Sequence, residues 1–265
     1  MTRADPPSAS PAVLPDGAVP AATLVIMRPS DSGGPDEILM VKRSAAMAFA
    51  AGAVVFPGGR VDPDDYLVAR RHAPDLDEAD GAARVAAVRE TLEETGLAVG
   101  WPGLKEDDAA DIRRALLAGE LMSDLLAARG DRIAIETLVP FARWCPNFKE
   151  ARTFDTRFYA IAAPPHSHEL TVEEAEHSHI FWASAKETLS MADRGEVSVI
   201  FPTRRNLERL ALSADFSSFS EYSSRFPVDL ITPWIEERDG QSWLCIPEHL
   251  GYPVTRESFD RVRRG

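Results

Sequence analysis

Four charged residues close together in the chain, Arg89, Glu90, Glu93 and Glu94, have the types and spacing of a metal-binding group. On a helix that advances about 100° per residue, the three carboxylates share an arc of roughly 100°, with Arg89 at its edge. Like charges at i and i+4, such as Glu90 and Glu94, weaken a helix, whereas a hard cation such as Mg²⁺ takes such oxygen ligands and offsets their repulsion. Taken alone, the cluster is more often a solvated acidic face, so the surrounding motif decides between the two interpretations.

The segment that carries these residues has the pattern of a helix over about 81–95. Asp80 is expected as its N-cap, and Gly96 stands where a left-handed C-terminal cap is expected. The apolar residues recur at i, i+3 and i+7, at Val85, Val88 and Leu92. The helix would therefore bury one side and present the glutamates on another.

Elsewhere, short β-prone runs and helical patterns mix without a regular βαβ order. Composition typical of strands is found at 22–27, 37–42, 53–56, 133–143, 153–162 and 180–182, and turn residues at 30–35 make the first two an expected hairpin. Helices are expected at 106–129, interrupted at Gly119, at 184–193 and at 203–212, and a terminal β pair at 230–236 and 242–246. The mixture predicts an α+β fold, or a helix–sheet–helix sandwich.

The run Arg89-Glu90-Thr91-Leu92-Glu93-Glu94-Thr95-Gly96-Leu97 resembles the second half of the Nudix box, R-E-U-x-E-E-x-G-U, where U is a bulky apolar residue. Thr91 fills the first U position. Upstream, Phe56-Pro57-Gly58-Gly59 resembles the strand-to-loop start of the same box. The resemblance implies a hydrolase of the Nudix family with an α/β/α sandwich around a mixed sheet.

The resemblance also implies roles for individual residues. Mg²⁺ or Mn²⁺ would bind Glu90, Glu93, Glu94 and the backbone carbonyl of Gly58. The implied catalytic group is Glu93 as the base for water, Arg89 as the residue that orients a glutamate, and Glu176 as a carboxylate from a loop beyond the box. For Glu176, a solvated loop position is the alternative.

The box is interrupted in this chain. Gly59 and Arg89 are 30 positions apart, where the usual spacing is 14, which leaves 16 extra residues within 61–79. The expected upstream glutamate falls on Gly81, and the nearby Glu78 and Asp80 are out of register. The downstream half is intact, and we expect the loop and the helix to converge if the insertion bulges outward.

An interrupted box resembles that of the coenzyme A diphosphatase-like Nudix subgroup. The upstream pattern of that subgroup, L-L-T-x-R-[S/A]-x3-R-x3-G-x3-F-P-G-G, is matched here at Leu39, Met40, Arg43, Ser44, Gly52 and 56–59, but Val41 and Ala48 replace its threonine and second arginine. The implied substrate-binding residues are Arg43, Gly59 and Arg152, and the implied substrate is coenzyme A or an acyl-CoA. Alternatives are ADP-ribose, a nucleotide sugar, cofactor-capped RNA, or a nucleotide-sensing domain without catalysis.

The resemblance implies one Nudix domain over 20–265, with the insertion at 61–79, a helical insertion at 105–130 and a C-terminal extension at 200–265. Residues 1–19, rich in Pro, Ala and Ser, are expected to be a disordered lead-in, not a targeting segment.

Charge and composition restrict the partners. The formal net charge of −13 disfavours binding to nucleic acid and leaves a divalent cation to mediate contact with an anionic substrate, the expected small-molecule nucleoside diphosphate derivative. No apolar run approaches the roughly 20 residues of a membrane helix, so no membrane partner and a cytoplasmic location are expected. The oligomeric state stays open, with a homodimer among the alternatives.

Overall fold

The computed structural model describes residues 14–43, 52–146, 153–165 and 179–262. Within that part of the chain, eight strands form a large sheet whose bounds are β1 Val19–Arg28, β2 Glu37–Lys42, β3 Val54–Val55, β4 Gly58–Arg60, β5 Val139–Trp144, β6 Phe154–Ala162, β7 His179–Ser184 and β8 Leu230–Ile231. The main order is β3-β2-β1-β6-β5-β8, with β4 paired to β1 and β7 to β2. The sheet is mixed, because β1–β6 and β5–β8 are parallel and the other pairs antiparallel.

The central strand β1 explains why the sheet is covered on both faces. Successive side chains of a strand point to opposite faces of the sheet. In β1, the side chains on each of the two faces are apolar. Leu24 and Ile26 belong to one buried cluster, and Val25 and Met27 belong to the other. Two separate cores therefore flank the sheet.

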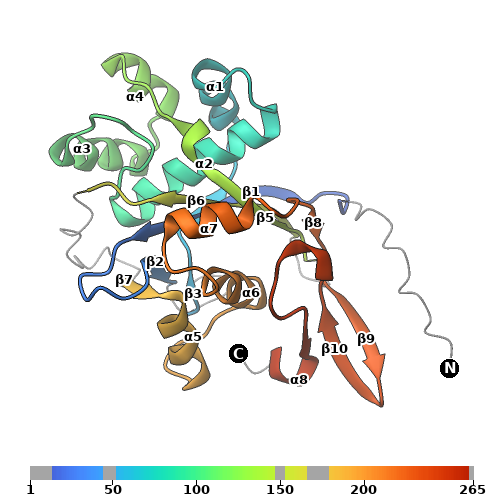
Figure 1. Ribbon diagram of the computed structural model, residues 1–265. Coiled ribbons are helices and arrows are strands. Elements are labelled where there is room, and N and C mark those ends of the chain that lie inside the picture. Colours follow the sequence, from blue (N-terminus) through green and yellow to red (C-terminus); the bar gives the residue numbers. More distant parts are fainter. Residues whose placement is uncertain (1–13, 44–51, 147–152, 166–178, 263–265) are drawn as a thin grey trace.

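Helices fill both layers (Figure 1). The first core is covered by α1 Pro63–His72, α2 Glu78–Thr95, α3 Glu106–Leu117 and α4 Met122–Arg129. The second is covered by residues from α5 Ala185–Asp193, α6 Phe201–Leu210 and α7 Phe216–Ser223. This arrangement confirms the predicted helix–sheet–helix sandwich with a mixed sheet. In the described part of the chain, no helix combines the length and the apolar character needed to cross a bilayer.

The C-terminal segment adds a small antiparallel sheet of order β11-β10-β9. Its strands are β9 Trp234–Arg238, β10 Gln241–Cys245 and β11 Arg256–Ser258, followed by α8 Phe259–Val262. Leu244 and Ile246 of this segment enter the second core. The extension is thus packed against the sandwich.

Several expected boundaries are wrong. The helix expected at 81–95 begins at Glu78, because Asp77 and not Asp80 is its N-cap. The strand expected at 133–143 begins only at Val139, after a 3-10 turn at Ile135–Thr137, and the segment expected as one strand at 230–236 is divided between β8 and β9. The insertion at 61–79 contains the helix α1, which had not been expected.

Candidate active site

Helix α2 is fixed at both ends by its own sequence. The Asp77 side chain accepts a hydrogen bond from the Asp80 amide, and Gly96 ends the helix with φ at 75°, the left-handed cap that the sequence predicts. Asp80 instead ties the helix to β6, since its carboxylate accepts hydrogen bonds from the Tyr159 hydroxyl at 2.8 Å and the Arg157 guanidinium at 3.2 Å. These contacts place the following turns of α2 over the sheet.

Thr91, the unusual residue of the box, is fully buried in α2. Its hydroxyl donates to the Ala87 carbonyl at 2.7 Å, so the polar atom is satisfied within the helix. A threonine is therefore compatible with this apolar position.

The loop Gly58–Gly59 lies directly against the glutamates of α2. The Gly58 amide donates to Glu94 Oε2 at 3.0 Å. A Cβ added to Gly59 would overlap the Glu90 carboxyl group, and one added to Gly58 would overlap the backbone of Ala22 and Thr23. The loop and the helix thus converge despite the insertion. Close approach to the backbone requires glycine at Gly58, whereas a side chain at position 59 would displace the Glu90 carboxyl group.

Burial changes the acidity of the three glutamates. Loss of hydration raises the pKa of Glu90 to about 7, partly offset by the Arg89 charge, and raises the pKa of Glu94 to about 7, partly offset by the Gly58 amide. The pKa of Glu93 is also raised by burial. Since the carboxylates repel one another as well, a cation at this place would be attracted strongly.

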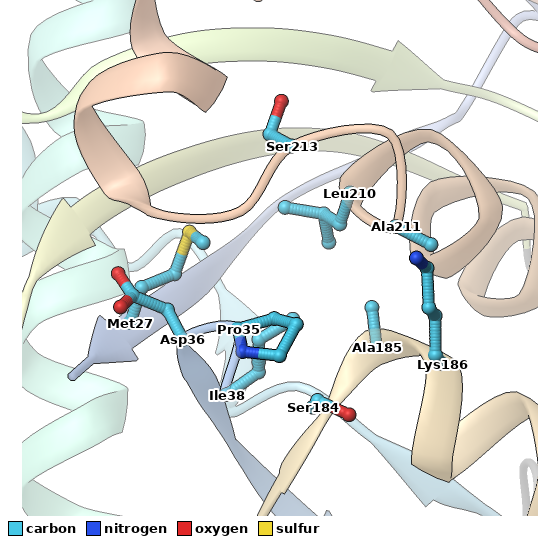
Figure 2. Close-up of a pocket in the computed structure, with 10 residues that line it drawn as sticks. All are labelled: Met27, Pro35, Asp36, Ile38, Ser184, Ala185, Lys186, Leu210, Ala211 and Ser213. Atoms are coloured by element: carbon cyan, nitrogen blue, oxygen red, sulfur yellow. The ribbon is translucent and has the colours of Figure 1, made fainter. Parts of the chain in front are cut away.

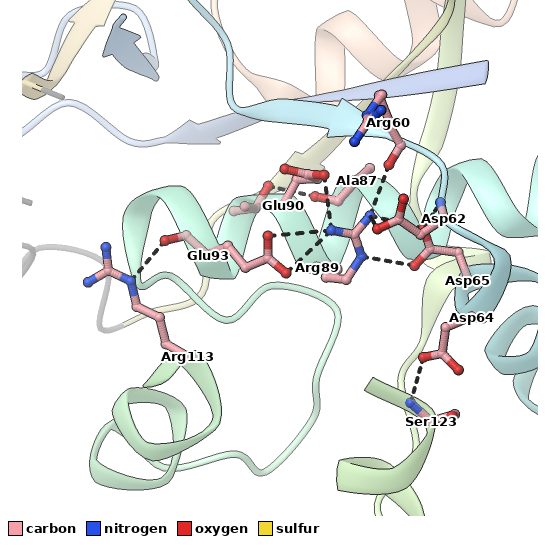
Figure 3. A network of polar contacts seen from close by, with 11 residues as sticks. Arg60, Asp62, Asp64, Asp65, Ala87, Arg89, Glu90, Glu93, Arg113 and Ser123 are labelled. Carbon is pink, nitrogen blue, oxygen red and sulfur yellow. Dashed lines mark hydrogen bonds and ion pairs between the residues drawn. The ribbon is translucent and has the colours of Figure 1, made fainter. Parts of the chain in front are cut away.

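Arg89 is the centre of a buried ion-pair network (Figure 3). Its Nη1 donates to Glu90 Oε1 at 2.9 Å and, at 3.3 and 3.4 Å, to the two carboxylate oxygens of Glu93. Its Nη2 donates to the Arg60 carbonyl at 2.9 Å. Burial alone would lower the Arg89 pKa, but the surrounding carboxylates more than reverse this, so the guanidinium stays charged.

Sequence reasoning missed two acidic members of this network, both from the insertion: Asp62, whose carboxylate lies 3.6 Å from Arg89 Nη2, and Asp65, which makes the closer contact. The two carboxylate oxygens of Asp65 accept from Arg89 Nε and Nη2, each at 3.0 Å, and its side chain is fully buried. A local signal was present, because Asp62-Pro63-Asp64-Asp65 has the spacing of a capping box with proline at the first helical position. That signal predicts a helix, but not its contact with Arg89.

Arg43 lies at the end of β2, and its positive charge acts on Glu94, whose pKa it lowers in part against the effect of burial. Its Nε is buried and has no hydrogen-bond partner among the described residues. A buried, unused donor beside the glutamates is suited to an anionic group.

Other expected site residues lie outside the described residues, namely Ser44, Ala48, Arg152 and Glu176. Within the part that is described, no three His, Cys, Asp or Glu side chains form a complete metal-binding group. The metal ligands named from the sequence therefore remain a proposal.

A small pocket lies elsewhere, where the start of β2 meets α5 and the end of α6 (Figure 2). Met27 and Ile38, which line it, belong to the core on the α5–α7 side of the sheet. The glutamates of α2 are on the other side, so this pocket is separate from the candidate site.

Comparisons with known proteins show the family of this chain. A family model described as the NUDIX domain matches residues 18–113. The crystal structure of a NUDIX hydrolase from Alicyclobacillus acidocaldarius is 30% identical, with 77% of this chain and 96% of that chain covered and a TM-score of 0.66. The chain belongs to the Nudix hydrolase family.

Other Nudix relatives are more distant. "Putative nudix hydrolase 7" of Caenorhabditis elegans is 26% identical over 192 residues, which are 71% of this chain. The chain spans only 60% of the length of that relative. A mutT/nudix family structure from Listeria innocua is 20% identical, with 76% of this chain and 94% of that chain covered and a TM-score of 0.43.

Replacing Gly58 with alanine is expected to lower the melting temperature by roughly 5–15 °C. Gly58 has φ at 153°, and the added Cβ would overlap the β1 backbone, which cannot move away as a side chain can. Gly103→Ala is the control, since Gly103 also has positive φ, 81°, but open space around it. Thermal unfolding of both variants measures the difference, and equal losses would contradict the close approach.

Proposed function

We propose that this Nudix protein is a divalent-metal-dependent hydrolase that cleaves the diphosphate link of a nucleoside diphosphate derivative. The observation that carries the proposal is the position of Glu90 and Glu94, two partly buried carboxylates of raised pKa held against the Gly58–Gly59 loop. Such a pair is costly in a protein unless a cation or protons neutralise it.

The carboxylates and the backbone carbonyl at this site are ligands of the kind that Mg²⁺ and Mn²⁺ bind. Mg²⁺ is commonly held by one or two carboxylates together with substrate phosphates, not by a complete protein cage. Glu90 and Glu94 would supply these carboxylates, with the Gly58 carbonyl as a further donor; a metal contact from Glu93 is the alternative to its role as the base for water. When bound, the metal would supply Lewis-acid stabilisation of phosphate charge and a lower pKa for a coordinated water.

The protein's own side chains would do the remaining work. Glu93 makes only long contacts to Arg89, 3.3 and 3.4 Å, so its carboxylate is available to accept the proton of the attacking water. Arg89 would hold Glu90 in place through its 2.9 Å hydrogen bond.

Arg43 would donate the N–H of its unused Nε to a substrate phosphate. Glu176 stays a candidate for a second base, and Arg152 for a further phosphate contact.

Within this class we propose coenzyme A or an acyl-CoA as the substrate. Support comes from the spacing of Arg43, Gly52 and 56–59, which matches the coenzyme A subgroup, and from the placement of Arg43 beside Glu94. Water would add across the diphosphate link of coenzyme A and yield 4′-phosphopantetheine and adenosine 3′,5′-bisphosphate. The Val41 and Ala48 replacements weaken the match to the subgroup pattern.

A substrate panel tests both levels of the proposal. The purified chain is incubated with coenzyme A, acetyl-CoA, ADP-ribose and a nucleotide sugar, each with Mg²⁺, with Mn²⁺ and with a chelator, and products are separated by chromatography. We expect coenzyme A turnover that needs the metal. Turnover of ADP-ribose or the nucleotide sugar without coenzyme A turnover would contradict the proposal that coenzyme A is the substrate. Tight binding of a nucleotide with no hydrolysis would contradict the activity and favour a sensing domain.

A further inference from the structure

The insertion within the Nudix box places a buried acidic residue, Asp65, next to the candidate site. Asp65 is the third residue of α1, and its side chain is fully buried against α2. It binds the Arg89 guanidinium through both carboxylate oxygens, a fork-to-fork geometry that fixes the plane of the guanidinium as well as its distance (Figure 3). The box glutamate expected at position 81 is absent, since that residue is Gly81.

The five N–H donors of Arg89 are divided between two sides. Asp65 and the Arg60 carbonyl accept from Nε and Nη2, and the Asp62 carboxylate lies farther from Nη2, at 3.6 Å. Nη1 is directed at Glu90 and Glu93. The geometry points to Asp65 as a positioning residue. By holding the Arg89 guanidinium in one orientation, Asp65 keeps Nη1 directed at Glu90 and Glu93, and the interrupted box has no glutamate at position 81 that could hold Arg89 in this way. The kinetic part of this inference rests on the proposed hydrolase activity.

The negative charge of Asp65 is as important for Arg89 as the geometry of their contact. Arg89 is buried and charged, so loss of its strongest partner leaves a cation that must be satisfied by the remaining carboxylates. Glu90 and Glu93 would then be drawn into closer pairing with Arg89, and their oxygens would be less available to a metal. Loss of such an outer contact to metal ligands typically costs about 10–100-fold in metal affinity or activity.

The neighbouring Asp64 provides a matched control. It is also buried, also lies in the first turn of α1 and also accepts a hydrogen bond, from the Ser123 amide at the start of α4 at 3.0 Å. Among the described residues, Asp64 makes no hydrogen bond or ion pair with Arg89. Asp64→Asn and Asp65→Asn therefore both remove a buried charge that anchors α1, but only the second touches the Arg89 network.

The experiment compares the full-length variants at a temperature where all are folded. We expect Asp65→Asn to lower kcat by about 10–100-fold with KM changed less than about threefold, and to weaken Mn²⁺ binding, measured by electron paramagnetic resonance, by about 10–100-fold. We expect Asp64→Asn to keep kcat and Mn²⁺ affinity within about twofold. Equal kcat and equal Mn²⁺ affinity in the two variants would overturn the role of Asp65.

A double-variant test separates positioning from mere structural support. If Asp65 acts through Arg89, Asp65→Asn should have no further effect on kcat, within about twofold, once Arg89→Gln is present. Additive losses would overturn the inference, because they would mean that Asp65 acts by another route. If the wild-type chain hydrolyses no diphosphate, the proposed function fails, whereas the Mn²⁺ affinities of the two single variants still decide on Asp65.

Discussion

Replacement of Glu93 by glutamine is expected to lower kcat for diphosphate hydrolysis by about 10²–10⁴-fold, the usual contribution of a general base. Glutamine has nearly the same size and can still accept the hydrogen bond from Arg89, but it cannot take a proton from water. Because Glu93 is partly exposed and its contacts to Arg89 are long, the substitution removes little packing. The fold should therefore remain, with far-ultraviolet circular dichroism unchanged.

The control for this substitution is Glu78→Gln in the first turn of the same helix. Glu78 is exposed, with a side chain 60% accessible, and its ion pair is with Arg70, away from the site. We expect its kcat to remain within about twofold of wild type. Activity of Glu93→Gln within fivefold of wild type would contradict the assignment of Glu93 as the base.

The downstream half of the box could be predicted from local sequence. Gly96 ends α2 as a left-handed cap, and Val85, Val88 and Leu92 are buried in the first core as their spacing predicts. Both features depend on residues within a few turns of one another, so a single segment contains the necessary information.

Contacts between distant segments could not be predicted in the same way. The Glu94–Gly58 hydrogen bond joins residues 36 positions apart, and the Arg89–Asp65 pair joins residues 24 apart. From the sequence, convergence of the loop and the helix is expected only if the insertion bulges outward. Nothing in the sequence distinguishes Asp65 from the other acids of the insertion. Which acid contacts Arg89 depends on how α1 packs on α2, which is a tertiary property.

The boundaries of the C-terminal strands differ from these long-range contacts, because local residues mark them. Pro233 lacks a backbone N–H, and it stands between β8, which joins the large sheet, and β9, which does not. Asp239 and Gly240, with φ of 52° and 76°, lie between β9 and β10, where an Asp-Gly pair favours a two-residue hairpin turn. Pro233 thus marks the division of 230–236, and the Asp-Gly pair marks the turn that follows β9.

The second large effect expected concerns stability in the absence of metal. The pKa of Glu90 and that of Glu94 rise from the ordinary 4.5 to about 7 in the folded protein, because burial disfavours the charged form. The folded state therefore binds more protons than the unfolded state between these pH values, and the free energy of unfolding falls as the pH rises through that window. Metal-free protein should melt at a lower temperature at pH 8 than at pH 5.

Glu94→Gln isolates this effect, because the amide oxygen can still accept from Gly58 but carries no charge. At 1.36 kcal/mol for each pKa unit, the variant should gain at most about 3.4 kcal/mol over wild type at pH 8 without metal, or roughly 7–14 °C in melting temperature, and almost nothing near pH 4.5. Glu78→Gln, which alters an exposed carboxylate, should show no such difference.

Addition of Mg²⁺ or Mn²⁺ at pH 8 should reverse the order of stability. A cation that binds the folded state alone stabilises it in proportion to the logarithm of its concentration over the dissociation constant. Wild type should therefore gain melting temperature with added metal, whereas Glu94→Gln, which has lost a charged ligand, should gain much less. A wild-type melting temperature that changes neither with pH nor with added metal would contradict the view that the partly buried glutamates of α2 are held charged by a bound cation.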